Sequence, residues 1–140
     1  RTFKAFEDKL KPIPGITETL DNLSVPYCVA SSGPLSKIQH NLNIVGLSER
    51  FKEKMFSCYE IDKWKPEPEI FLYAAQEMGF HPADCAVIED STVGVQAALN
   101  GGFDVFHFTK KSSCSQNFSE TVFSFHNMYD LANLLHSIER

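Results

Sequence analysis

The stretch from Cys85 to Ala98 constrains the fold of this chain more than any other. It begins with four apolar residues, continues into Glu89 and Asp90, and then passes through hydroxyl and glycine residues into an alanine-rich segment. This order is typical of a buried parallel strand, an acidic turn at its carboxyl end and a helix that covers the sheet. We therefore predict an α/β fold with both carboxylates at one edge of the sheet.

The adjacent carboxylates of Glu89 and Asp90 indicate a bound cation. Ligands of open α/β sheets bind outside the carboxyl ends of the strands, so both side chains would face that crevice. Neighbouring carboxylates repel each other unless a positive charge lies between them, and Mg²⁺ usually takes one or two protein carboxylates together with water and substrate phosphate. The alternative is a solvated turn in which Ser91 or Thr92 caps the next helix.

Size and charge limit the classes of partner. The 140 residues fit one domain, which is large enough to bury roughly two-thirds of its unfolded surface. The chain is 43% hydrophobic, yet no apolar run approaches the roughly 18 residues of a membrane span. A net charge of -5 argues against a nucleic-acid surface. It leaves room for a small anionic ligand, because one lysine and a few backbone amides hold a phosphate.

The cysteine pattern indicates a reducing environment. The four cysteines are widely separated and form no Cys-x-x-Cys pair: Cys28, Cys58, Cys85 and Cys114. Two of them lie in apolar, strand-like runs. We predict buried, unreactive thiols in a cytoplasmic protein rather than metal ligands or disulfides.

Strand-like and helix-like segments alternate along the chain. Apolar runs predict strands over 25–30, 55–59, 103–108 and 121–125 besides the one before Glu89, and helices are expected over 16–23, 35–45, 69–78 and 129–138. Such alternation predicts a doubly wound parallel sheet. The opening residues 1–10 place Phe3, Phe6 and Leu10 at helical intervals, which predicts an amphipathic helix.

A small polar loop follows the strand predicted over 25–30. It reads Ser31-Ser32-Gly33-Pro34, and its small residues let backbone amides approach an anion closely. A simple cap on the following helix is the alternative.

Lys65 precedes a proline-rich helix start. Helix dipoles favour anions at amino termini, so a lysine at this place indicates that an anion lies nearby. Glu67 and Glu69 are alternative sources of that negative charge.

Three segments together resemble one known family. Val29–Gly33, Lys65–Phe71 and Ile88–Gly94 resemble, in order and spacing, the second, third and fourth motifs of the haloacid dehalogenase-like hydrolase superfamily. The resemblance is to its phosphatase and β-phosphoglucomutase-like branch, nearest to bacterial 6-phosphogluconate phosphatases. It implies a Rossmann-like core over residues 1–140, in which residues 1–11 end a helix of the cap domain.

The resemblance also implies roles for individual residues. Ser31 and Lys65 would be catalytic, the phosphate would be bound by Ser31, Ser32, Gly33 and Lys65, and Glu89 and Asp90 would hold Mg²⁺. The implied function is a cytoplasmic, Mg²⁺-dependent phosphatase of a small phosphorylated metabolite such as a sugar phosphate. Lysine and cation would neutralise charge on the transferring phosphoryl group.

The sequence departs from the family in lacking the motif that carries the nucleophile. Members carry an Asp-x-Asp-Gly motif after their first strand, and no such motif occurs in this sequence. We therefore expect a fragment of a longer enzyme that lacks the first central strand and is inactive by itself. An empty strand position would leave backbone groups unpaired and open a route to self-association.

Two other functions fit the same motifs. One is a phosphosugar mutase of the β-phosphoglucomutase type, since the cap chooses between water and a second hydroxyl as acceptor. The other is a truncated, non-catalytic relative that acts as a binding module.

Overall fold

The computed structural model describes residues 3–6, 16–23, 25–109, 122–127 and 130–131. Its strands form one parallel sheet in the order β3-β2-β1-β4-β5-β6. They are β1 (Phe3–Phe6), β2 (Tyr27–Ser31), β3 (Met55–Ser57), β4 (Cys85–Glu89), β5 (Asp104–Phe108) and β6 (Val122–Phe125). The predicted α/β class with a parallel sheet is confirmed.

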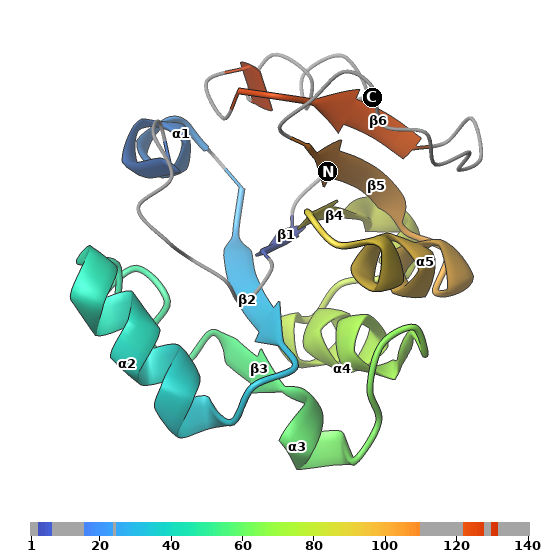
Figure 1. Ribbon diagram of the computed structural model, residues 1–140, viewed down its shortest axis with the longest axis horizontal. Helices are drawn as coiled ribbons and strands as arrows, with labels where there is room; N and C mark the ends of the chain where they lie inside the picture. Colours follow the sequence, from blue (N-terminus) through green and yellow to red (C-terminus); the bar gives the residue numbers. More distant parts are fainter. Residues whose placement is uncertain (1–2, 7–15, 24, 110–121, 128–129, 132–140) are drawn as a thin grey trace.

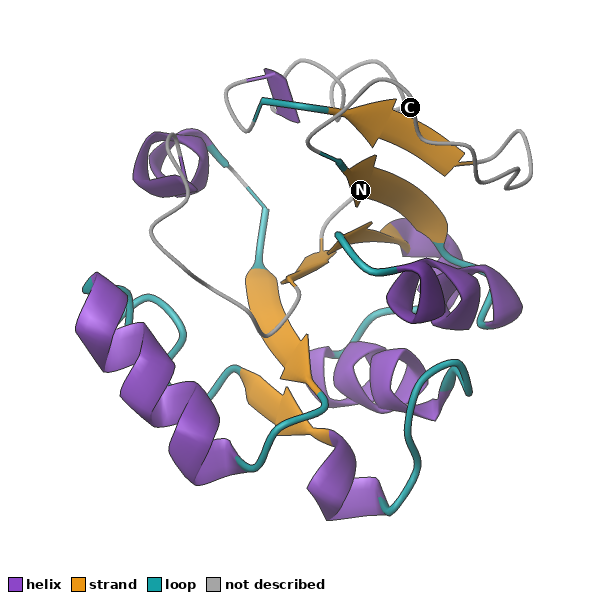
Figure 2. Ribbon diagram, viewed as in Figure 1, coloured by secondary structure: helices purple, strands orange, loops and turns teal. Residues whose placement is uncertain are grey.

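Helices cover both faces of this sheet (Figures 1 and 2). They are α1 (Ile16–Asn22), α2 (Leu35–Val45), α3 (Cys58–Ile61), α4 (Glu69–Met78) and α5 (Thr92–Asn100), with a short 3-10 turn η1 (Pro82–Asp84) before β4. Helices α4 and α5 lie on one face, and α1 and α2 lie on the other. This is the doubly wound arrangement that the alternating segments predict.

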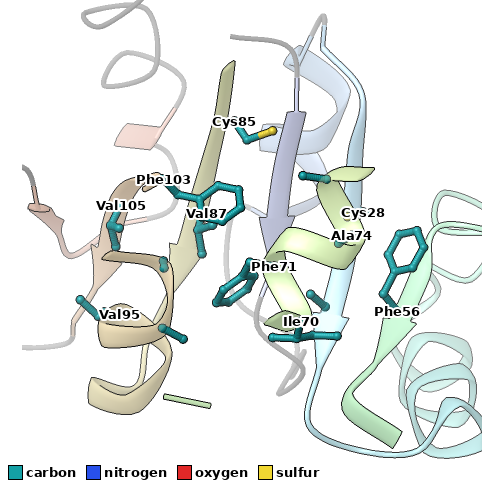
Figure 3. Close-up of a cluster of buried hydrophobic side chains, with 14 of the residues drawn as sticks. Cys28, Phe56, Ile70, Phe71, Ala74, Cys85, Val87, Val95, Phe103 and Val105 are labelled. Carbon is teal, nitrogen blue, oxygen red and sulfur yellow. The ribbon is translucent and has the colours of Figure 1, made fainter. Parts of the chain in front are cut away.

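Two apolar clusters hold the layers together. Cys28 and Ala30 of β2 belong to the cluster beneath α4 and α5, which Figure 3 shows. Val29, between them, belongs to the opposite cluster with Leu20 and Leu42 from α1 and α2. Because side chains alternate across a strand, a continuous apolar run can supply both cores at once.

Glycines end helices α2 and α4. Gly46 follows α2 with φ 77° and Gly79 follows α4 with φ 87°, and their amides donate to carbonyl groups of the last helical turn. A residue without Cβ adopts this left-handed conformation without steric strain.

The predictions for the opening segment are corrected by β1. Phe3–Phe6 is a strand and not part of a helix, and it pairs with β2 on one side and β4 on the other. The central position predicted to be empty is therefore filled by β1, and the open strand position from which self-association was expected is occupied. The helical spacing of Phe3 and Phe6 is overridden because two neighbouring strands offer unpaired backbone groups to an extended segment.

Other predictions concern the thiols and the chain end. Cys28, Cys58 and Cys85 are buried and unoxidised, as predicted, while Cys114 and most of the helix predicted over 129–138 lie outside the described residues. Among the helices that the structure describes, none has the length and apolar character needed to cross a bilayer.

Candidate functional site

The register of the sheet brings the predicted site residues to one edge. Phe6 of β1 lies opposite Val29 of β2 and opposite Ile88 of β4. Ser31 comes two residues after Val29, and Glu89 directly follows Ile88. Ser31 and Glu89, far apart in the sequence, therefore both lie at the carboxyl edge and flank the end of β1.

Lys65 reaches this edge through an ion pair. Its Nζ lies 2.8 Å from Oε2 of Glu89, and the two side chains are only 5% and 0% exposed. The segment that carries Lys65 is also held from α5, because the Asn100 side-chain amide donates to the Pro66 carbonyl at 3.2 Å. The structure thus joins two of the three predicted motifs directly.

The other oxygen of Glu89 is fully engaged as well. Oε1 accepts from the Asp90 amide at 3.1 Å, from the Ser91 amide at 3.2 Å and from the Ser91 hydroxyl at 3.0 Å. Burial raises the pKa of Glu89, and this effect outweighs the lowering by Lys65 and by the hydrogen bonds from Ser91. Glu89 is therefore an inward-facing anchor of the site.

Gly94 leaves the space that this anchor occupies. A Cβ on Gly94 would lie 2.0 Å from Cδ and 2.2 Å from Oε2 of Glu89. Gly94 lies in the first turn of α5, and its amide donates to the hydroxyl of Ser91, which caps the helix, at 3.1 Å. The helix cap predicted for Ser91 is present. The same Ser91 hydroxyl also donates a hydrogen bond to Glu89.

Asp90 differs from Glu89 in exposure and in hydrogen bonding. It follows β4 directly and is exposed, whereas both oxygens of Glu89 already accept hydrogen bonds. No three His, Cys, Asp or Glu side chains within the described ranges form a metal-binding group. The donors fit a hard cation bound by one protein carboxylate, Asp90, with water and substrate oxygens completing its shell.

The loop after β2 has a defined hydrogen-bond pattern. The Gly33 amide donates to Ser31 Oγ at 2.9 Å, and the Gly33 carbonyl accepts from Ser57 Oγ at 2.6 Å. Ser31 is buried and Ser32 and Gly33 are half-buried. The Gly33 amide is engaged within the loop, and among the described residues none accepts from the Ser31 hydroxyl or the Ser32 amide, so these two groups are the loop's candidate donors to an anion.

Two residues of the site escaped the sequence analysis. The apolar run over 55–59 predicts one strand through Tyr59, but β3 ends at Ser57 and α3 begins at Cys58. A polar residue directly after an apolar run was the available signal. Gly94 belongs to the motif over Ile88–Gly94, but no sequence signal shows that its missing side chain leaves space for Glu89.

Comparison with known proteins identifies the family. Residues 1–102 match the sequence profile described as haloacid dehalogenase-like hydrolase. The chain belongs to this family. The match includes all three motifs that the resemblance rests on.

Characterised relatives of this haloacid dehalogenase-like hydrolase include phosphatases. It is 34% identical over 105 residues to 6-phosphogluconate phosphatase of Escherichia coli, covering 75% of this chain and 48% of the relative. It is 38% identical over 107 residues to a bifunctional riboflavin kinase/FMN phosphatase of Arabidopsis thaliana, covering 74% of this chain and 28% of the relative. The chain thus spans about half or less of the length of these relatives.

Solved structures share the fold. A haloacid dehalogenase-like protein from Agrobacterium tumefaciens superposes with a TM-score of 0.79 at 27% identity, covering 90% of this chain and 60% of that one. A family hydrolase from Deinococcus radiodurans, solved with bound phosphate and sodium, gives a TM-score of 0.78 at 25% identity over 89% of this chain and 59% of that one.

Proposed function

We propose that the protein is an Mg²⁺-dependent phosphatase that hydrolyses a small phosphorylated metabolite such as a sugar phosphate. The observation that carries the proposal is the buried ion pair of Lys65 and Glu89, with Nζ and Oε2 2.8 Å apart, at the edge where Ser31 also lies. Lysine and glutamate side chains are almost never fully buried unless they are paired, and a buried charge pair beside a crevice is a candidate for a functional site. The phosphatases among the family relatives support the reaction class.

Each residue has a distinct part in this proposal. The Ser31 hydroxyl donates a hydrogen bond to the phosphoryl group, and Lys65 neutralises charge that develops on the same group. Glu89 holds Lys65 in place, so that the ammonium group is oriented before the substrate arrives. Asp90 would hold Mg²⁺, which when bound supplies further neutralisation of the phosphoryl oxygens.

The charge of the chain and its relatives support a small phosphorylated substrate. The chain carries a net charge of -5, so we expect anion binding to depend on a few groups in the crevice rather than on a broad basic face. That arrangement suits a small monoester better than a polyanion. The named substrate of one relative, 6-phosphogluconate, belongs to this class.

The test is a phosphatase screen of the protein expressed from its complete coding sequence. A panel of sugar phosphates, FMN and nucleoside monophosphates is assayed for phosphate release with Mg²⁺ and with EDTA. The 140-residue chain is assayed in parallel and is expected to be inactive, because no Asp-x-Asp-Gly motif supplies the nucleophile.

The expected result is Mg²⁺-dependent release of phosphate from at least one sugar phosphate. Product analysis with a hexose 1-phosphate separates hydrolysis from mutase chemistry, since a mutase yields the 6-phosphate isomer without free phosphate. A protein that neither releases nor moves phosphate on the whole panel would overturn the proposal and favour a binding module.

A further inference from the structure

Ser57 is a buried hydroxyl residue with two partners in different parts of the chain. It ends β3 and is 0% exposed. Its Oγ donates to the Gly33 carbonyl, 24 positions away in sequence, at 2.6 Å and accepts from the Tyr59 amide at 3.0 Å. A buried hydroxyl that lost either partner would leave a polar group unsatisfied, which is costly.

Gly33 is thereby held on both sides. Its amide donates to Ser31 Oγ at 2.9 Å and its carbonyl accepts from Ser57. Glycine has more backbone freedom than any other residue, so these two bonds define which of many conformations the loop adopts. Without the bond from Ser57, one of the two restraints on Gly33 is lost.

The conformation of Gly33 affects which hydrogen bonds the Ser31 hydroxyl can make. A serine hydroxyl has one proton to donate and two lone pairs to accept with. Because the Gly33 amide occupies a lone pair of Ser31 Oγ, that bond disfavours hydroxyl rotamers that point the proton back at the loop. No described residue accepts the Ser31 proton, which remains for an anion in the crevice.

We propose that Ser57 is a positioning residue of the phosphate site: through Gly33 it orients the Ser31 hydroxyl as a donor to the phosphoryl group. This inference rests on the proposed phosphatase function. Ser57 does not touch the phosphoryl group itself, and its effect is on the binding of phosphate by the loop of Ser31, Ser32 and Gly33.

A purely structural role for Ser57 makes a different prediction. Ser57 caps α3, and its own amide donates to Oε1 of Glu60 at 2.9 Å, so the two residues form a reciprocal capping box. Glu60→Ala removes that second bond and leaves the contact between Ser57 and Gly33 intact. It is therefore the matched control for a change that affects only α3.

The experiment compares Ser57→Ala, Ser57→Thr and Glu60→Ala in the protein expressed from its complete coding sequence. Inorganic phosphate is the probe, and its affinity is measured by calorimetry and as an inhibition constant. Amide hydrogen exchange at Gly33 supplies a readout that needs no activity, and thermal unfolding reports on folding.

We expect Ser57→Ala to weaken phosphate binding about tenfold, since about one buried hydrogen bond is lost, and to speed exchange at Gly33. Ser57→Thr, which keeps the hydroxyl, should restore both readouts, and Glu60→Ala should lower the unfolding temperature while leaving both unchanged.

If Ser57→Ala and Glu60→Ala had equal effects on phosphate affinity and on amide exchange at Gly33, Ser57 would act only as the cap of α3. That result would overturn the inference. The same holds if Ser57→Ala binds phosphate as the wild type does. A wild-type protein that binds no phosphate at all would instead overturn the proposed function on which the inference rests.

Discussion

The Nζ atom of Lys65 lies 2.8 Å from Oε2 of Glu89, and both side chains are almost completely shielded from water. Lys63 and Glu67 form a second pair in the same segment, but its atoms are 3.8 Å apart and its side chains are half-exposed. The two pairs differ in burial far more than in chemistry. They allow the contribution of burial to be measured within one stretch of chain.

Lys65→Ala should destabilise the protein by about 3–5 kcal/mol at neutral pH, because it leaves the buried Glu89 carboxylate without its counter-charge. Lys63→Ala removes an exposed pair and should change the free energy of unfolding by less than about 0.5 kcal/mol. Chemical denaturation of both variants measures the difference. Similar small losses in the two variants would show that Glu89 does not depend on Lys65.

The pH dependence of stability should carry a signature of Glu89. Burial raises the pKa of this carboxyl group in the folded protein, so its contribution to stability is fully present below the unfolded value of about 4.3. It is lost as the pH rises from there through the folded pKa, with a limiting slope of about 1.4 kcal/mol per pH unit.

Glu89→Gln removes this titration and serves as the reference. The free energy of unfolding of the wild type, measured from pH 4 to 8, should fall relative to that of Glu89→Gln as the pH rises. The other carboxyl groups are common to both proteins and cancel in the difference. A difference that is flat, or that rises with pH, would contradict the raised pKa.

Gly94→Ala should destabilise the protein although alanine is the better helix former by about 1 kcal/mol. The new Cβ would lie 2.0 Å from Cδ of Glu89, and such overpacking typically costs about 1–3 kcal/mol. In a Glu89→Ala background the clash is absent, so the same substitution should be neutral or stabilising. The sign change between the two backgrounds, measured by denaturation, is the decisive result.

In the protein expressed from its complete coding sequence, Asp90→Asn should strongly lower phosphatase activity without loss of stability. Asp90 is exposed, so the free energy of unfolding should change by less than about 0.5 kcal/mol, while loss of a carboxylate ligand should cost about a hundredfold or more in turnover. Asp84→Asn, at another exposed aspartate just before β4, is the control and should retain full activity. Retained Mg²⁺-dependent turnover in Asp90→Asn would remove the proposed metal ligand.

Much of the fold could be predicted from the sequence because its signals are local. The apolar run before Glu89, the glycines after α2 and α4, and the loop at Ser31 each act through neighbouring residues in the chain. The three motifs also indicated the family. The order of such segments was enough to predict a doubly wound parallel sheet with its polar residues at one edge.

The tertiary structure decided what local patterns leave open. Phe3–Phe6 has helical spacing, yet it forms a strand because β2 and β4 both present backbone groups that need partners. The two adjacent carboxylates look alike in sequence, but Glu89 is turned inward to Lys65 while Asp90 is exposed. Burial, pairing and the room left by Gly94 depend on residues distant in the chain, and no local pattern contains them.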